Sequence, residues 1–575
     1  LVSERGDLVL TADARIDNRD DLIRSLTTNG HLAESDPTDA DLILNAYECW
    51  GTDCPTHLIG DFAFAIWDAA KQCLFAARDP LGMRSFYYRA EPRRFIFATE
   101  LKQVLAVPNV QTTVFEPAAA SYLAGLFGPP EWTSYQGIFQ LSPAHALLVD
   151  AEGHSTWRYW DIDPAYQITY ANEDEYAEHF LEIFKEAVHC RLRSVKPVGV
   201  FLSGGMDSGS VTSTAGWLLQ RGASHYCHPL RAYCYAFDEL TQCDERHISN
   251  EIARYYGLPV TSIPAETFWP LKGYPADGPD RDDPLTGAYQ ALINHTLNTA
   301  RAAGVQLMFT GRYGDLMAGG GVFDYPDQVY ARQWSKLWGD LRNHSQQTGI
   351  PLIRVIKRHV IKPLIDKIYP NWTHKWLYRV VNTMLKRPKT QWYPEWIRPE
   401  FAERVGLDEI IRKSDPQTRI KGFARRERYK WIVNPLDIRL KVWAERIHAK
   451  LGLAYADPWC DRRIFSFAMA VPQRIFGQAG EYKPLVKRAM NGIMPEVTRQ
   501  VAGKTYPEPL YKRAIVEQAR ETVLGLLAGS KADDFGYLDE QVLRQHYDSI
   551  CNGADEHHAF WWALTLEMWL RQHWS

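Results

Sequence analysis

A short glycine-rich segment behind an apolar strand is the feature that most constrains the fold of this chain. Residues 198–202 are mostly apolar and β-branched or aromatic, which predicts a buried strand. The segment that follows reads Ser203-Gly204-Gly205-Met206-Asp207-Ser208. A helical pattern then continues to Leu219. Strand, glycine turn and helix in this order predict the first unit of a βαβ fold, with a ligand at the carboxyl end of the strand.

The residue types of this glycine loop (203–208) favour a phosphate-binding role. Gly204 and Gly205 carry no side chains, so their N–H groups can approach phosphate oxygens, and the following helix adds its dipole. Ser203 and Ser208 can donate hydroxyl hydrogen bonds. Asp207 would repel phosphates unless it binds a metal ion. The spacing matches neither the P-loop nor the dinucleotide fingerprint. We therefore predict ATP and Mg²⁺ as cofactors, with the loop holding pyrophosphate.

The pattern beyond the loop alternates strands with helices. Strands are expected at 232–237, 260–263 and 305–310, and helices at 246–256 and 288–303. This alternation predicts a mostly parallel, doubly wound sheet. Leu202 and Tyr235, at two strand ends beside the loop, are candidates for framing the adenine.

A second motif ends the strand expected at 305–310. It reads Thr310-Gly311-Arg312-Tyr313-Gly314-Asp315. Because ligands bind beyond the carboxyl ends of parallel strands, Asp315 is expected to face Asp207 across one Mg²⁺, with Gly311 beside the nucleotide. Capping of a helix is the alternative role for Asp315.

Two lysines near the C-terminus are candidate catalytic residues. Lys483 follows Glu481-Tyr482, and Lys504 follows Arg499 by five positions. Either can neutralise the α-phosphate and a developing oxyanion. A surface role is the alternative for both.

The first 160 residues have a different pattern of predicted secondary structure. Short β-type runs with turn signals alternate around one helix at 39–49, which predicts an α+β domain of antiparallel sheets. We place domain boundaries at 1–165 and 166–575, with a helical, aromatic and basic insertion at about 323–440. The basic groups of this insertion are either a solvated helix face or a docking surface for an extended or acidic ligand.

Composition excludes several classes of protein. The net charge of -4 gives no support to nucleic-acid binding, and no stretch approaches the length of a membrane span. Nine cysteines stand singly, without the pairs of a zinc or disulfide framework. We expect reduced thiols and a cytoplasmic location.

Several long motifs occur in the order found in one known superfamily. Besides the glycine loop, the 310–315 motif and the segments around Lys483 and Lys504, they are 60–68, 77–84, 97–102 and 457–463. Together they resemble the asparagine synthetase superfamily along nearly the whole chain. The resemblance implies an Ntn-hydrolase-like, glutaminase-type antiparallel sandwich at the N-terminal end. It also implies a doubly wound, ATP-pyrophosphatase-type synthetase domain after it.

The glutaminase-type part departs from the family pattern. The Asn-Gly-Glu segment of working members aligns with Asp13-Ala14-Arg15, which places a carboxylate where an oxyanion donor belongs. No cysteine precedes Cys49, and the chain starts inside the domain, so its N-terminal portion is absent from this sequence. We expect a degenerate domain without glutamine hydrolysis.

The synthetase site departs from the pattern as well. A glutamate of ammonia-using relatives corresponds to Arg312, so an amine of the substrate itself is the expected nucleophile. β-Lactam synthetases have a tyrosine at this position, whereas Tyr313 lies one residue away. The long insertion favours a peptide substrate, so the chain most resembles the lasso peptide cyclases.

That resemblance implies a precursor peptide as substrate, with a leader peptidase and a leader-binding protein as partners. The reaction would be adenylation of an Asp or Glu side chain, followed by closure of a macrolactam. A β-lactam or carbapenam synthetase acting on a small amino acid, and a glutamine-dependent asparagine synthetase, are the alternatives.

Overall fold

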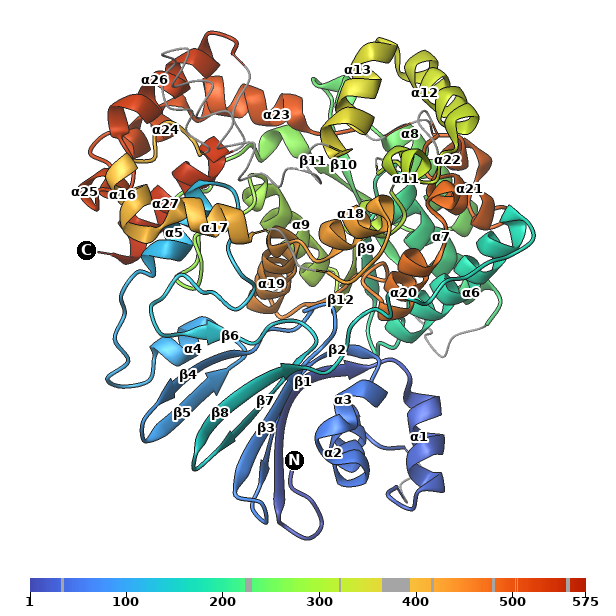
Figure 1. Ribbon diagram of the computed structural model, residues 1–575, viewed down its shortest axis with the longest axis vertical. Helices are drawn as coiled ribbons and strands as arrows, with labels where there is room; N and C mark the ends of the chain where they lie inside the picture. Colours follow the sequence, from blue (N-terminus) through green and yellow to red (C-terminus); the bar gives the residue numbers. More distant parts are fainter. Residues whose placement is uncertain are drawn as a thin grey trace.

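The computed structural model describes residues 1–32, 36–222, 230–319, 322–364, 393–414, 418–477, 481–501, 503, 505–554 and 559–574. Two domains stack against each other. The N-terminal domain, blue to teal in Figure 1, carries the antiparallel strands, and the remainder of the chain forms the second domain above it. Lys504 lies outside the described residues.

The N-terminal domain consists of two antiparallel sheets and a layer of helices. The five-stranded sheet has the order β1-β2-β3-β7-β8, with β1 Leu8–Ile16, β2 Gly60–Asp68, β3 Cys73–Arg78, β7 His145–Asp150 and β8 Gly153–Arg158. The three-stranded sheet has the order β5-β4-β6, with β4 Tyr87–Glu91, β5 Arg94–Ala98 and β6 Phe139–Gln140. The helices beside the larger sheet are α1 Arg19–Thr28, α2 Asp39–Trp50 and α3 Cys54–His57.

Strand β2 is apolar along most of its length because both of its faces are buried. Phe62, Phe64 and Ile66 pack in the core shared with α1 and α2. Ala63 and Ala65 face the second sheet, whose bulky residues fill the space between the layers. Alternation of large and small apolar residues therefore builds the predicted antiparallel sandwich.

The second domain contains a parallel sheet, as predicted. Its order is β11-β10-β9-β12-β13, with β9 Val198–Phe201, β10 Arg231–Ala236, β11 Val260–Pro264, β12 Leu307–Phe309 and β13 Ala454–Ala456. All four pairings are parallel. The chain leaves β9 toward β10 and later returns on the other side through β12. This is the switch point at which ligands bind in doubly wound sheets.

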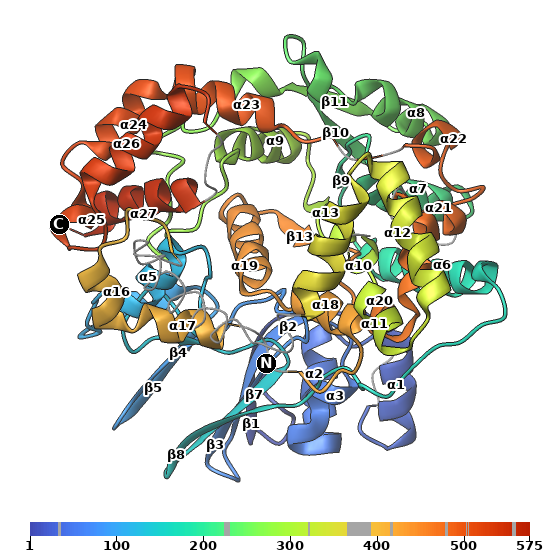
Figure 2. The same ribbon diagram turned by 45° about the horizontal axis from the view of Figure 1, so that its top comes forward.

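Helices cover both faces of this sheet. α6 Glu173–Arg191, α7 Met206–Gln220 and α8 Arg246–Tyr256 lie on one side of β9, and α9 Gln290–Ala302 and α19 Pro435–Lys450 lie on the other (Figures 1 and 2). Helix α6 is capped at its N-terminus. The Asn172 side chain accepts hydrogen bonds from the N–H groups of Asp174 and Glu175.

The described parts of the predicted insertion are mainly helical. They include α11 Tyr325–Tyr330, α12 Trp334–Thr348, α13 Leu352–Ile356, α16 Pro399–Val405, α17 Leu407–Lys413 and α18 Phe423–Ile432. The C-terminal helices include α20 Arg462–Ala470, α21 Pro484–Ala489, α23 Glu508–Arg513, α24 Arg520–Leu527, α26 Glu540–Cys551 and α27 Ala559–His573. Among the described residues, no helix is long and apolar enough to cross a membrane.

Candidate active site

A cavity of about 340 Å³ opens at the carboxyl edge of the parallel sheet. Its walls are the loops after β9, β10 and β12 together with one side of α19. Eight of the residues predicted from the sequence line it: Leu202, Ser203, Gly205, Asp207, Ser208, Tyr235, Gly311 and Arg312. Segments far apart in the chain therefore meet at the predicted switch point.

Three consecutive N–H groups of the glycine loop bind oxygen atoms of side chains. Ser203 N donates to Ser208 Oγ at 3.0 Å, and Gly205 N donates to Ser203 Oγ at 3.2 Å. Gly204 N donates to Glu245 Oε2 at 3.0 Å. A Cβ on Gly204 would lie 2.9 Å from Glu245 Cβ, so the close approach of α8 requires glycine here. The backbone N–H groups of the loop are thus hydrogen-bond donors, and one of them already binds a carboxylate oxygen.

The two predicted motifs touch through their glycines. A Cβ on Gly311 would lie 2.4 Å from Ser208 N, and one on Gly314 would lie 2.3 Å from Asp207 Oδ1. Any side chain at either position would push the loops apart. These glycines keep the loop after β12 against the loop after β9.

Lys483 joins the two predicted metal ligands. Its Nζ forms ion pairs with Asp207 and, at 2.7 Å, with Asp315, and the lysine side chain is 1% exposed. Lys483 itself precedes α21 and has a left-handed backbone conformation, with φ of 49°. Two carboxylates thus share one buried cation.

This donor set fits a magnesium nucleotide. Carboxylate oxygens are the ligands that Mg²⁺ prefers, and Lys483 brings Asp315 close to Asp207, which lines the cavity. The Glu245 carboxylate on Gly204 N–H shows that the loop can receive an anionic oxygen, as phosphate binding requires.

Asp457 stabilises the loop after β12 directly and the loop after β9 through Trp459. Its carboxylate accepts hydrogen bonds from Thr310 Oγ1 at 2.6 Å and from the backbone N–H groups of Arg312 and Trp459, each at 2.9 Å. Burial raises the pKa of Asp457 to about 6, although these hydrogen bonds oppose the rise. Trp459 Nε1 in turn donates to Asp207 O at 3.2 Å. The 457–463 motif therefore fixes the positions of the loops after β9 and β12.

Arg312 and Tyr313, adjacent in sequence, point to different places. The Arg312 guanidinium lines the cavity and lies over the Trp443 ring, 5.2 Å from its centroid. Tyr313 is 1% exposed, does not line the cavity, and lies against Lys441. Burial raises the pKa of its hydroxyl well above its usual value. The structure thus brings Arg312, but not Tyr313, to the cavity at the carboxyl edge of the parallel sheet (the nucleotide cavity).

Sequence reasoning missed several residues of the cavity. Glu245, which precedes α8, accepts a hydrogen bond from the glycine loop. Trp443 and His448 come from α19, whose sequence carries no recognisable motif. His448 Nδ1 pairs with Ala444 O at 2.6 Å, and burial lowers the pKa of the imidazole to about 4. The available signal was that Glu245 lies in the segment between β10 and α8, at the carboxyl edge of the sheet.

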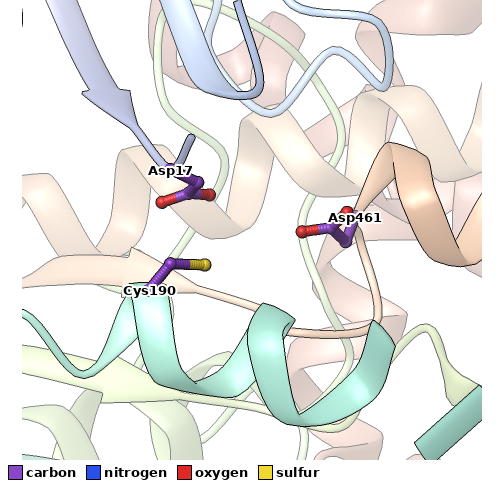
Figure 3. Close-up of side chains that lie close together, drawn as sticks. All are labelled: Asp17, Cys190 and Asp461. Atoms are coloured by element: carbon purple, nitrogen blue, oxygen red, sulfur yellow. The ribbon is translucent and has the colours of Figure 1, made fainter. Parts of the chain in front are cut away.

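A second cluster of possible metal ligands lies between the two domains. Figure 3 shows Asp17 after β1, Cys190 on α6 and Asp461 before α20 converging on one point. Arg191 occupies the space between the carboxylates, with Nη1 at 2.8 Å from Asp461 and 3.4 Å from Asp17. Burial raises the pKa of the Cys190 thiol to about 12, so it stays protonated. This cluster is a buried ion-pair network that joins the domains.

The positions that replace the glutaminase signature are also paired. Arg15 binds Asp17 and Asp61, each at 2.8 Å. Asp13 lies 3.5 Å from the guanidinium of Arg84, which reaches Glu445 of α19 at 3.2 Å. Side chains at these positions therefore hold the domain interface.

Comparison with known proteins agrees with this architecture. Residues 179–571 match the asparagine synthase family, and residues 1–160 match the glutamine amidotransferase domain family. Asparagine synthetase [glutamine-hydrolyzing] 3 of Bacillus subtilis is 36% identical over 226 residues, which are 39% of this chain and 35% of that protein. Amidase chry2 of Gibberella zeae is 31% identical over 236 residues, 39% of this chain and 34% of the relative.

A longer alignment exists at lower identity. Asparagine synthetase [glutamine-hydrolyzing] 1 of Bacillus subtilis is 22% identical over 565 residues, which are 97% of this chain and 84% of that protein. The matches at higher identity span only about a third of their relatives. The chain belongs to the asparagine synthase family.

Proposed function

We propose that this protein is an ATP-dependent macrolactam synthetase of the lasso peptide cyclase type. It would adenylate an Asp or Glu side chain of a precursor peptide and close the ring with the peptide's own N-terminal amine, releasing AMP and pyrophosphate. The observation that carries this proposal is the cavity lined by the glycine loop, Asp207 and Arg312, with Lys483 bridging Asp207 to Asp315 beside it.

In the first step, the negative charge of the triphosphate must be neutralised. A carboxylate oxygen of the peptide attacks the α-phosphorus of ATP, and the bond to pyrophosphate breaks. The N–H groups of the glycine loop and the Lys483 ammonium receive the charge of the leaving group. Mg²⁺ held by Asp207 and Asp315 would neutralise part of the triphosphate charge.

The second step forms the amide. The peptide amine attacks the acyl carbon, AMP leaves, and the nitrogen loses one proton. Arg312 cannot accept this proton because a guanidinium stays charged at physiological pH. The side chain at this position therefore does not prepare free ammonia, which supports an amine delivered by the substrate.

The N-terminal domain supplies further support. Arg15 and Asp13, which stand at the glutaminase signature, are engaged by Asp17, Asp61 and Arg84. A guanidinium and a carboxylate in these ion pairs offer no neutral amide donor for an oxyanion. Glutamine is therefore not the proposed nitrogen source.

Space for a larger substrate lies beside the nucleotide cavity. A second cavity of about 760 Å³ is enclosed by loops of the N-terminal domain and by α17, α18 and α19. Helix α19 contributes Ile438 and Lys441 to this cavity, and Trp443 and His448 to the smaller one. A volume well above that of the nucleotide cavity favours a peptide over a single amino acid.

The test is ATP-dependent pyrophosphate release with matched substrates. Peptides with a free N-terminus and a downstream Asp or Glu are compared with N-acetylated and amide-substituted versions. The proposal predicts release with the acidic peptides, and a cyclic product only when the N-terminus is free. Release driven by a β-amino acid, or glutamate formed from glutamine, would contradict it in favour of the two alternatives.

A further inference from the structure

The Arg312 guanidinium is an uncommitted cation in the nucleotide cavity. Within the described part of the chain it has no carboxylate within ion-pair distance, although several acidic groups lie nearby. Asp457 binds the backbone N–H of Arg312 rather than its side chain. Asp437 attracts Arg312 only from beyond ion-pair distance. Burial raises the pKa of Asp437, and the positive charges of Lys441 and Arg312 partly offset that rise. The charge of Arg312 is therefore available to a ligand.

Trp443 provides an aromatic platform for this guanidinium, whose carbon lies 5.2 Å from the ring centroid. The indole is 3% exposed, and its ring edge lies against Gly287, where a Cβ would be only 2.9 Å away. The platform is therefore fixed by packing from its far side. A guanidinium stacked on an aromatic face keeps its N–H edge free for a planar, two-oxygen partner.

The position of Arg312 separates it from the phosphate-binding groups. Lys483 already joins Asp207 and Asp315, and these residues with the glycine loop form the wall suited to the triphosphate. Arg312 follows Gly311, which touches Ser208, so the guanidinium starts beside that wall and extends toward α19. The activation of a carboxylic acid by ATP brings two anions into one site, and each needs its own cation.

We propose that Arg312, supported by Trp443, binds the carboxylate that is to be adenylated. This assignment rests on the proposed function, to which it adds the group that selects an acidic side chain. Two N–H donors hold one carboxylate group while an oxygen of that group attacks the α-phosphorus and pyrophosphate leaves. Arg312 neither gives nor takes a proton, and it remains beside the carbonyl oxygen on which negative charge develops during amine attack.

Arg312→Gln and Arg312→Lys test this role against a matched control. Arg342 is also stacked on a tryptophan, 5.2 Å from the Trp338 centroid, but it lies on α12 and does not line the cavity. Initial rates of pyrophosphate release are measured while the acidic peptide and ATP are varied separately. We expect Arg312→Gln to raise the KM for the peptide about 10- to 100-fold, as for loss of a charge-assisted hydrogen bond.

The remaining measurements separate the possible outcomes. The KM for ATP should change by less than about twofold, Arg312→Lys should recover part of the loss, and Arg342→Gln should match the parent. An unchanged KM for the peptide would overturn the assignment. A rise in the KM for ATP equal to that for the peptide would also overturn it, because Arg312 would then bind phosphate.

Inhibition by an amide-substituted peptide provides an independent test of the role of Arg312. The parent protein should bind the acidic peptide more tightly than its Asn or Gln counterpart, and Arg312→Gln should bind both equally. Retained preference for the acid in Arg312→Gln would overturn the role. If the parent protein activates a small amino acid instead of any peptide, the proposed function fails, and the same comparison on that acid still decides the role of Arg312.

Discussion

Around Asp17, at the interface of the domains, each buried arginine is paired with carboxylates, whereas Arg312 in the cavity beside the glycine loop lies on an aromatic ring. Arg15, Arg191 and Arg463 pair there with Asp17, Asp61 and Asp461. Beside the glycine loop, Lys483 bridges Asp207 and Asp315, while Arg312 lies over the Trp443 ring and has no ion pair among the described residues. The paired arginines serve cohesion of the fold, whereas the guanidinium of Arg312 faces a cavity that can receive a ligand.

The pKa shifts follow the same division. Burial alone would raise the pKa of Asp461, but Arg191 and Arg463 outweigh it and hold the pKa well below its usual range. Asp457, which lies under the catalytic loops without such pairing, has its pKa raised to about 6 by burial. The arginines thus hold Asp461 in its ionised state, whereas burial disfavours the ionised state of Asp457.

Asp207→Asn should have the largest effect on activity. The variant keeps the shape of the side chain but removes the charge that binds Lys483 and the predicted Mg²⁺. We expect pyrophosphate release to fall about a thousandfold, as for loss of a major electrostatic group. Thermal unfolding of the same variant checks that it is folded. Unimpaired release would remove Asp207 from the metal site.

Arg191→Leu should have the largest effect on stability. It leaves Asp17, Asp61 and Asp461 short of a buried cation, which typically costs about 3–5 kcal/mol. Urea unfolding measures the loss. Arg24→Leu is the control, because Arg24 forms an exposed ion pair on α1 that is worth less than about 1 kcal/mol. Equal stability of the two variants would refute a cohesive role for the network.

Glu445→Gln should change how stability depends on pH. Burial raises the pKa of Glu445 to about 7, Arg84 opposes this, and Asp13 adds to it. Because the folded pKa exceeds the unfolded value, protonated Glu445 favours the fold below the unfolded pKa, and that contribution is lost as pH rises through about 7. Melting temperatures from pH 5 to 8.5 should decline less for the variant. Parallel curves for both proteins would contradict the assignment.

Asp13→Asn should have the smallest effect. Asp13 lies 3.5 Å from Arg84 and is 37% exposed, so its loss removes only a partly solvated interaction. We expect pyrophosphate release to change by less than about twofold. Matched assays with and without glutamine provide the measurement. Glutamate production would show that this domain retains glutaminase chemistry.

Local patterns in the sequence predicted much of this arrangement. The strand at 198–202, the glycine loop and the helix after it are local features, and the structure places them as β9, its loop and α7. The loop after β12 was predicted for the same reason, since its glycines precede a carboxylate. The predicted antiparallel sandwich likewise follows from alternation visible in single strands such as β2.

Features that depend on distant contacts could not be predicted. Strand β13 has three residues and is defined only by its pairing with β12. Lys483 was predicted near the α-phosphate, but its position between Asp207 and Asp315 depends on a left-handed residue and on tertiary packing. The stacking of Arg312 on Trp443 joins loops and helices far apart in the chain. Nothing in the local sequence indicates such a pair.

Transfer of a heavy oxygen isotope tests the central claim most directly. A precursor peptide is labelled at the carboxylate oxygens of its acidic side chain and incubated with the protein, ATP and Mg²⁺, and the products are weighed by mass spectrometry. Our account predicts one labelled oxygen in AMP and a cyclic peptide that has lost one labelled oxygen. Unlabelled AMP alongside the cyclic peptide, or labelled AMP with only a side-chain amide as product, would contradict it.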